Sequence, residues 1–177
     1  MKKRTTKRVV TSLLFSIMVT SLAVAPVLPS VGGGTAYAAT TKQTKQLAAV
    51  YARIQKEHAA EVVQLVNEER VNAGLKPLVI HTNLSTMAKD KAIDMFKSNY
   101  FSHTSPKYGS PFDMMDAYNI TYRYAGENIA MGQKSAEEVV KAWMNSPGHK
   151  ANILNENYGL IGVGYYNGYW VQEFVGK

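Results

Sequence analysis

The spacing of apolar residues changes along this chain of 177 residues, and the change constrains the fold more than any other feature. Up to about residue 145, apolar side chains recur every three or four residues, as in amphipathic helices. From Ile161 they alternate, Asn167-Gly168 follows, and a second run extends from Tyr169 to Val175. Asn-Gly between two such runs predicts a β-hairpin. Helices followed by strands, without βαβ repetition, indicate an α+β fold with helices packed on an antiparallel sheet.

Capping residues set the expected helix boundaries. Gly74 ends the first helix, Thr82 or Asn83 begins the second, and Ser110 and Ser135 lead capping motifs for the next two. The polar segment from Thr40 to Gln46 is expected to be a short linker. The expected helices cover about 47–73, 84–96, 111–118 and 136–145, with a helical turn at 150–154 and a further strand within 122–131.

The first 38 residues have the order of a secretory signal peptide. Five basic residues precede an apolar run from Val9 to Leu28, and Ala36-Tyr37-Ala38 forms a small-x-small cleavage site. Pro26 and Pro29 argue against a continuous membrane-spanning helix, so no stable transmembrane span is expected after cleavage. We therefore predict a signal peptide over 1–38, a linker or N-terminal helical extension over 39–56, and one domain over 57–177. Retention of the leader as an anchor stays open.

The leader also carries most of the net charge. Of the 20 Lys and Arg residues it holds five, which leaves 15 against 13 acidic residues and a net charge of +2. A near-neutral chain carries no electrostatic footprint for nucleic acid. The chain has no cysteine, so an exported domain of this size must be stabilised by its core or by a bound ion.

Three residues carry the chemistry that the sequence suggests. His103, Glu127 and His149 each lie within three residues of a proline or glycine, and imidazole and carboxylate are the groups used in metal ligation and proton transfer. Each also has a structural alternative: His103 and His149 could bond to backbone or cap a helix, and Glu127 could accept backbone N–H groups at a turn. His58 and His81 fit no motif. Ser105 and Ser146 lie near the histidines, but the elbow motif of a serine hydrolase is missing.

Taken in order, several segments resemble one known family. These are Asn67 to Leu78, Phe101-Ser102-His103, Gly126-Glu127-Asn128-Ile129, Trp143 and Gly148-His149. They resemble the CAP domain of cysteine-rich secretory, antigen 5 and pathogenesis-related 1 proteins, in its bacterial exported form. The resemblance covers about residue 57 to the C-terminus. It implies a three-layer α-β-α sandwich with a central antiparallel sheet and a large cleft.

The resemblance also implies which residues line that cleft. In the family, two histidines and two acidic residues line it and can hold a divalent ion, and His103, Glu127 and His149 match three of these places. The fourth place falls on Ser146, which is not acidic. His103, His149 and Glu127 are therefore the candidate metal ligands, with zinc as the first candidate by ligand type, and Ser146 completes the predicted cleft. Asn67 and Arg70 are expected to tie the first helix to the loop before Pro77.

Three classes of function follow. The first is a non-enzymatic exported protein, secreted or associated with the cell wall, whose cleft binds an envelope glycan, peptide or lipid and a divalent metal. The second is a metal-dependent hydrolase of cell-wall or peptide substrates, with Glu127 as general base. The third is a structural or partner-binding module. The incomplete acidic set and the lack of an identifiable nucleophile favour the first class.

Overall fold

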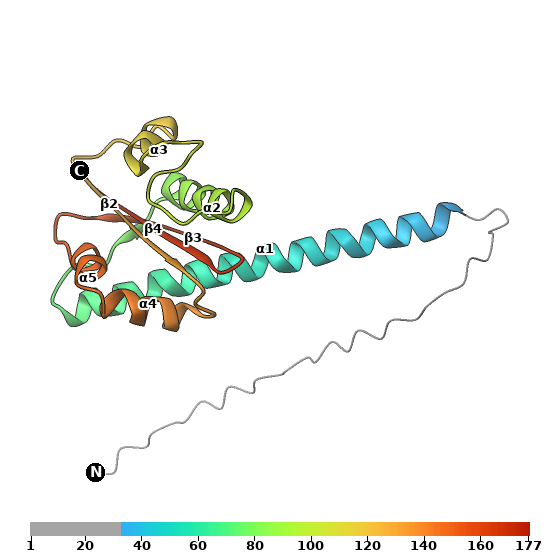
Figure 1. The fold of residues 1–177 in the computed structure, drawn as a ribbon. Coiled ribbons are helices and arrows are strands. Elements are labelled where there is room, and N and C mark those ends of the chain that lie inside the picture. Colours follow the sequence, from blue (N-terminus) through green and yellow to red (C-terminus); the bar gives the residue numbers. More distant parts are fainter. Residues whose placement is uncertain (1–32) are drawn as a thin grey trace, which may run out of the picture.

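The protein is a three-layer α-β-α sandwich, as predicted. The computed structural model describes residues 33–177, with side chains described from Thr41 onward. Figure 1 shows α2 and α3 on one side of a four-stranded sheet and α1, α4 and α5 on the other. The elements in chain order are α1 (Gly33–Asn72), β1 (Val79–Ile80), α2 (Thr82–Lys97), α3 (Pro111–Ala117), β2 (Tyr124–Met131), α4 (Ala136–Met144), α5 (Pro147–Ile153), β3 (Leu160–Tyr166) and β4 (Tyr169–Gly176).

The predicted hairpin forms the centre of the sheet. The strands lie in the order β1-β3-β4-β2, and β4 pairs antiparallel with both β3 and β2. Asn167 and Gly168 have positive φ angles of 46° and 84°, as a two-residue turn of type I′ requires. The two residues of β1 pair parallel with the start of β3, a pairing too short for the sequence pattern to reveal.

Both faces of the sheet are covered by apolar side chains. Trp143 of α4 and Trp170 of β4 are fully buried in the larger core, which lies between the sheet and the layer of α1, α4 and α5. On the opposite face, α2 lies directly on β3 because β3 carries glycines there. A Cβ built on Gly162 or Gly164 would come within 2.2 Å of the α2 backbone, at Leu84 and Ala88 respectively. This close approach fixes α2, which carries part of the site.

The predicted tie between α1 and the loop before Pro77 is present. The side chain of Asn67 donates to the carbonyl of Leu78 and accepts from its N–H, at 3.0 and 2.7 Å. Arg70 Nε donates to the carbonyl of Lys76 at 2.9 Å. The guanidinium of Arg70 also donates to three carbonyls around the end of α5, which the sequence did not predict. These bonds hold α5 against α1.

Two helix boundaries and one helix cap, expected at Thr82 or Asn83, differ from the sequence expectations. The segment from Thr40 to Gln46, expected as a linker, is helical and continuous with α1. His81, expected to have no special role, is the N-cap of α2, where Nδ1 accepts from the N–H of Leu84 at 3.3 Å. The turn expected at 150–154 is a helix that begins at Pro147, which places His149 in its first turn. Within residues 33–177, no helix combines the length and the apolar composition that a membrane span requires.

Most of the predicted signal peptide lies outside the described residues. Residues 1–32 are not described, and residues 33–38 are described only as the start of α1. The cleavage site and the domain boundaries at 38 and 56 therefore stay predictions.

Candidate functional site

Glu127 lies in the middle of a strand rather than at a turn. It occupies the fourth position of β2, opposite Glu173 of β4, and it is 8% exposed. The neighbouring Gly126 suggested a turn, but the structure gives it another reason. A Cβ at Gly126 would lie 2.4 Å from the hydroxyl of Tyr158, which donates to the carbonyl of Ala125 at 3.1 Å. Glycine is therefore required for close approach, and the strand continues through it.

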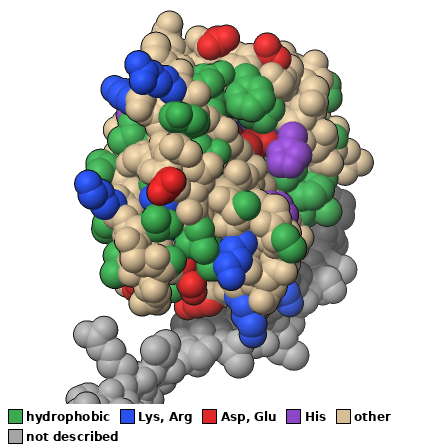
Figure 2. All heavy atoms as spheres, turned by 90° about the vertical axis from the view of Figure 1, so that its left-hand side faces the viewer, with side chains coloured by type: hydrophobic (Ala, Val, Ile, Leu, Met, Phe, Trp, Pro, Cys, Tyr) green, Lys and Arg blue, Asp and Glu red, His purple; other side chains and the backbone are tan. Residues whose placement is uncertain are grey.

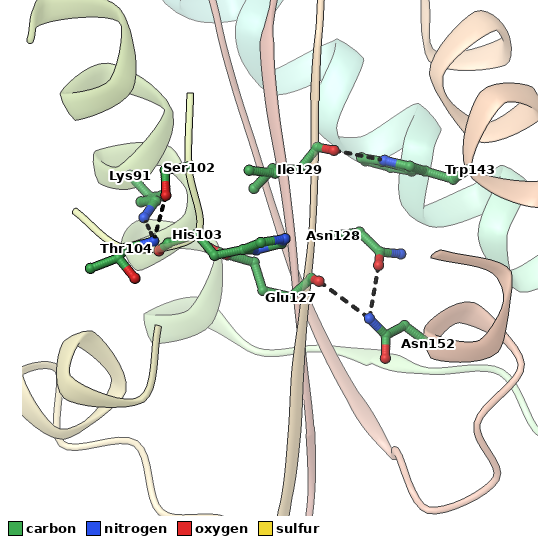
Figure 3. A network of polar contacts seen from close by, with 9 residues as sticks. All are labelled: Lys91, Ser102, His103, Thr104, Glu127, Asn128, Ile129, Trp143 and Asn152. Carbon is green, nitrogen blue, oxygen red and sulfur yellow. Dashed lines mark hydrogen bonds and ion pairs between the residues drawn. The ribbon is translucent and has the colours of Figure 1, made fainter. Parts of the chain in front are cut away.

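His103 and Glu127 form a direct pair. Nδ1 of His103 lies 2.6 Å from Oε1 of Glu127, and the two side chains are 55% and 3% exposed respectively. The hydrogen bond to Glu127 raises the pKa of His103, against the opposing effect of burial. Figure 3 shows His103 and Glu127 projecting toward one another from the loop and from β2. A buried carboxylate thus orients an imidazole that solvent or a ligand can reach.

The loop that carries His103 is anchored to α2 by polar contacts. Nζ of the buried Lys91 donates to the carbonyl of His103. Oδ2 of Asp94 accepts from the hydroxyls of Tyr100 and Ser105, at 2.5 and 2.7 Å. Oγ of Ser105 in turn accepts from two N–H groups of the same loop. Ser105 is therefore a buried turn residue bonded to Asp94, which agrees with the rejection of a serine nucleophile.

Glu173 is a further acidic residue of the site, and sequence reasoning missed it. It is completely buried on β4, and both of its carboxyl oxygens lack a hydrogen-bond partner among the described residues, as does Oε2 of Glu127. Burial and the neighbouring Glu127 raise the pKa of Glu173 well above the usual range, while Lys91 acts in the opposite direction. The signal in the sequence was a charged residue inside an otherwise buried strand, which is rare without a partner.

His149 is held close to the pair by amides of β2 and α5. Nδ2 of Asn128 donates to the carbonyl of His149 at 3.1 Å. Figure 3 shows the neighbouring bonds, in which Nδ2 of Asn152 donates to the carbonyl of Glu127 at 3.2 Å and to Oδ1 of Asn128 at 2.9 Å. Burial lowers the pKa of His149, and the charge of His103 lowers it further. The bond from Asn128 thus joins the backbone of His149 to the strand that carries Glu127, and we call His103, Glu127, His149 and Glu173 the acid–histidine site.

Of the predicted cleft residues, Ser146 has the least structural evidence for a place in this site. It is the N-cap of α5 but makes no side-chain capping bond. Among the described residues, no hydrogen bond joins it to His103 or Glu127. Figure 2 views this end of the domain and shows histidine side chains at the surface, with acidic atoms recessed beside one of them.

The side chains of the acid–histidine site are not arranged as a set of ligands for one metal ion. Within the described part of the chain, no three His, Cys, Asp or Glu side chains are arranged so that they could hold one ion. Nδ1 of His103 is already engaged by Glu127, although Oε2 of Glu127 has no partner among the described residues. The zinc site of His103, His149 and Glu127 therefore stays a prediction.

The fold places the chain among SCP-domain proteins. It resembles the crystal structure of an extracellular protein with an SCP domain from Bacillus anthracis, with a TM-score of 0.71 and 31% identity over 72% of this chain and 43% of that one. It also resembles an outer surface protein of Borrelia burgdorferi, with a TM-score of 0.61 and 26% identity over 65% of this chain and 89% of the other. The model of CAP, the cysteine-rich secretory protein family, matches residues 63–175, and the chain belongs to this family.

A sequence relative agrees with this assignment. The YkwD protein of Bacillus subtilis is 59% identical over 119 residues, which are 66% of this chain and 46% of YkwD. The chain thus spans less than half the length of that relative. The family match, over residues 63–175, includes all four residues of the acid–histidine site.

Proposed function

We propose that this protein is exported and that its acid–histidine site binds a ligand of the cell envelope or the extracellular space. One observation carries the proposal: the buried Glu127 holds the exposed imidazole of His103 at 2.6 Å, at the end of the domain where His149 also lies. A side chain fixed by a buried partner and still reachable from solvent is suited to contact a ligand. The signal-peptide pattern and the likeness to an extracellular protein support the location.

The chemistry of the site favours a polar ligand. When protonated, His103 offers a charged N–H donor, and the bond to Glu127 stabilises that form. Burial lowers the pKa of His149, which favours the neutral imidazole, and a neutral imidazole can accept as well as donate. Hydroxyl, carboxylate and amide groups of an envelope glycan or peptide, or a lipid headgroup, would match these donors and acceptors. A divalent metal bound with the ligand would use Nε2 of His103, because Nδ1 is engaged by Glu127, together with the imidazole of His149.

The test is binding by purified protein with the two histidines replaced. The probes are bacterial cell-wall sacculi in co-sedimentation and Zn²⁺ alone in calorimetry. We expect the double variant His103→Ala, His149→Ala to bind at least about tenfold more weakly, which corresponds to about 1.4 kcal/mol. His58→Gln is the matched control, because His58 packs against Tyr165 and Trp170 on the α1 side of the sheet.

Two outcomes would defeat the proposal. In the first, wild-type protein takes up neither probe; in the second, the double variant binds both probes as well as wild type does. If the double variant changes only thermal stability, the third class, a structural or partner-binding module, is the better account. Circular dichroism of each variant confirms that loss of binding does not reflect loss of fold.

The hydrogen-bonded pair of His103 and Glu127 also supports a second candidate function, a hydrolase of cell-wall or peptide substrates. A glutamate hydrogen-bonded to a histidine of raised pKa is a combination used in acid–base catalysis. In this case Glu127→Gln abolishes turnover of sacculi while the variant stays folded, and treatment with a chelator reports whether a metal takes part. A folded Glu127→Gln variant with full activity would exclude Glu127 as the base.

A further inference from the structure

The free edge of β3 lies outside the acid–histidine site and, among residues 33–177, has no partner strand over most of its length. β1 pairs only with Leu160 and Ile161, while β3 continues to Tyr166. The N–H of His81 donates to the carbonyl of Ile161 at 2.9 Å, so the backbone polar groups of Ile161 face the β1 side. Alternate residues of a strand face the same edge. The backbone polar groups of Val163 and Tyr165 therefore face this edge beyond the point where β1 ends.

This part of the edge carries none of the residues that usually block strand pairing, although Val163 and Gly164 are buried between the flanking helices and Tyr165 is half-buried. Exposed edges are commonly blunted by charged residues, proline or a bulge, or are covered by another element. β3 contains neither charge nor proline, and its register with β4 runs without interruption from Leu160 to Tyr166. The edge is thus a regular template for one more strand.

The edge forms the floor of a groove between two helices. The groove has a volume of about 910 Å³ and is bounded by α1 on one side and α2 on the other, with Val163, Gly164 and Tyr165 between them. Figure 1 shows the two helices on opposite sides of the sheet at β3. Apolar side chains contribute to both walls, among them Val63 of α1 and Ile93 of α2. The groove offers strand pairing along its floor and apolar contacts on its walls.

The rim of the groove is positively charged on both sides. Lys56 of α1 and Lys89 of α2 line it and are exposed, and neither forms a hydrogen bond or ion pair with a described residue. The lining also contains one acidic residue, Asp90, whose carboxylate accepts a hydrogen bond from the hydroxyl of Tyr118 at 2.6 Å. Two basic side chains against one acidic side chain leave an excess of positive charge, which complements acidic side chains of a partner.

We propose that this groove binds an extended acidic segment of a partner protein, which adds to β3 as a further strand. Main-chain hydrogen bonds to Val163 and Tyr165 supply affinity, and the walls and lysines select apolar and acidic side chains on alternating positions. The segment that binds is thus expected to alternate acidic and apolar residues. This surface is separate from the acid–histidine site, so either proposal can fail without the other.

The experiment measures fluorescence anisotropy of labelled octapeptides with the full chain at low ionic strength. Three probes alternate glutamate with valine, leucine or tyrosine. Each has two partners, one with lysine in place of glutamate and one with N-methyl groups on the backbone nitrogens of alternate residues. We expect at least one acidic probe to saturate, and both changes to weaken its binding at least about tenfold. N-methylation leaves the side chains in place, so its effect isolates main-chain pairing.

Protein variants test the place of binding. Lys56→Glu with Lys89→Glu is expected to weaken binding of the acidic probe at least about tenfold, whereas Lys141→Glu, an exposed lysine of α4 outside the groove, stays within about twofold of wild type. Hydrogen exchange is expected to show protection of residues 162–166 when the probe binds. The proposal is overturned if no acidic probe saturates, or if the N-methylated probe binds equally. It is also overturned if purified protein carries a fatty acid in the groove, or forms a dimer that the double lysine variant disrupts.

Discussion

Replacing Arg70 by methionine removes the guanidinium that joins α1 to the chain around the end of α5. Arg70 is 2% exposed and donates to four carbonyls: those of Lys76, Ile153 and Asn155 at 2.9, 2.7 and 2.9 Å, and that of Tyr158 at 3.3 Å. Methionine has a similar length and fills much of the same space. The substitution therefore tests the hydrogen bonds more than the packing.

The loss of stability can be estimated from these four bonds. The bonds to Ile153 and Tyr158 are buried, so their carbonyls lose a partner that water does not replace, whereas the other two are only partly buried. With a charged donor contributing about 1.5–3 kcal/mol a bond, the two buried bonds amount to about 3–6 kcal/mol. This is a large part of the ~5–15 kcal/mol that stabilises an ordinary domain.

Urea denaturation followed by tryptophan fluorescence measures this loss, because Trp143 and Trp170 are both buried. With a slope of about 1–3 kcal/mol per molar urea, the midpoint is expected to fall by at least about 1 M. The control is Arg53→Met, which removes an ion pair to Glu57 between side chains that are 79% and 62% exposed. Exposed helix pairs contribute about 0.3–0.5 kcal/mol. If both variants shift the midpoint equally, Arg70 does not hold α5 as described.

Three further predictions concern other parts of the molecule. The raised pKa of Glu173 means that the wild-type fold is stabilised while this carboxyl is protonated and loses that stability as the carboxyl ionises at higher pH. Glu173→Gln lacks the ionising group, so its stability relative to wild type is expected to increase from pH 5 to pH 8. Urea midpoints of the two proteins that run parallel across this range would contradict the prediction. Gly164→Ala should lower the free energy of unfolding by about 1–3 kcal/mol, because the added Cβ would lie 2.2 Å from the α2 backbone. In the same urea assay Gly148→Ala should not destabilise the fold, because its added Cβ meets no atom within 4 Å. Ser110→Ala should cost about 1 kcal/mol in thermal melts, because it removes the capping box of α3, and an unchanged melting temperature would refute that role.

The sequence predicted those parts of the fold in which local chemistry decides the structure. The Asn167-Gly168 turn and the capping box of Ser110 depend on contacts within a few residues, and the tie from Asn67 to Leu78 spans eleven residues of the chain. The helical character of residues 40–46 was missed because a polar stretch without a buried face shows no apolar period. His81 was missed because a histidine is an unusual N-cap.

The site could be located but not assembled from the sequence. Gly126 beside Glu127 resembled a turn, whereas the glycine accommodates Tyr158 from a segment about thirty residues away. Glu173 could not be placed near Glu127 without the register of β2 and β4. The pairing of His103 with Glu127 depends in the same way on the contacts of Lys91 and the loop, which no local pattern encodes.

The most direct test of the acid–histidine site is a nuclear magnetic resonance titration of the four histidine side chains of the chain with soluble cell-wall fragments. His103 and His149 are expected to shift together with one binding constant. His58, packed against Trp170, and His81, bonded to the N–H of Leu84, are expected to keep their positions. A titration that shifts His58 or His81 while His103 and His149 stay unchanged would contradict the account.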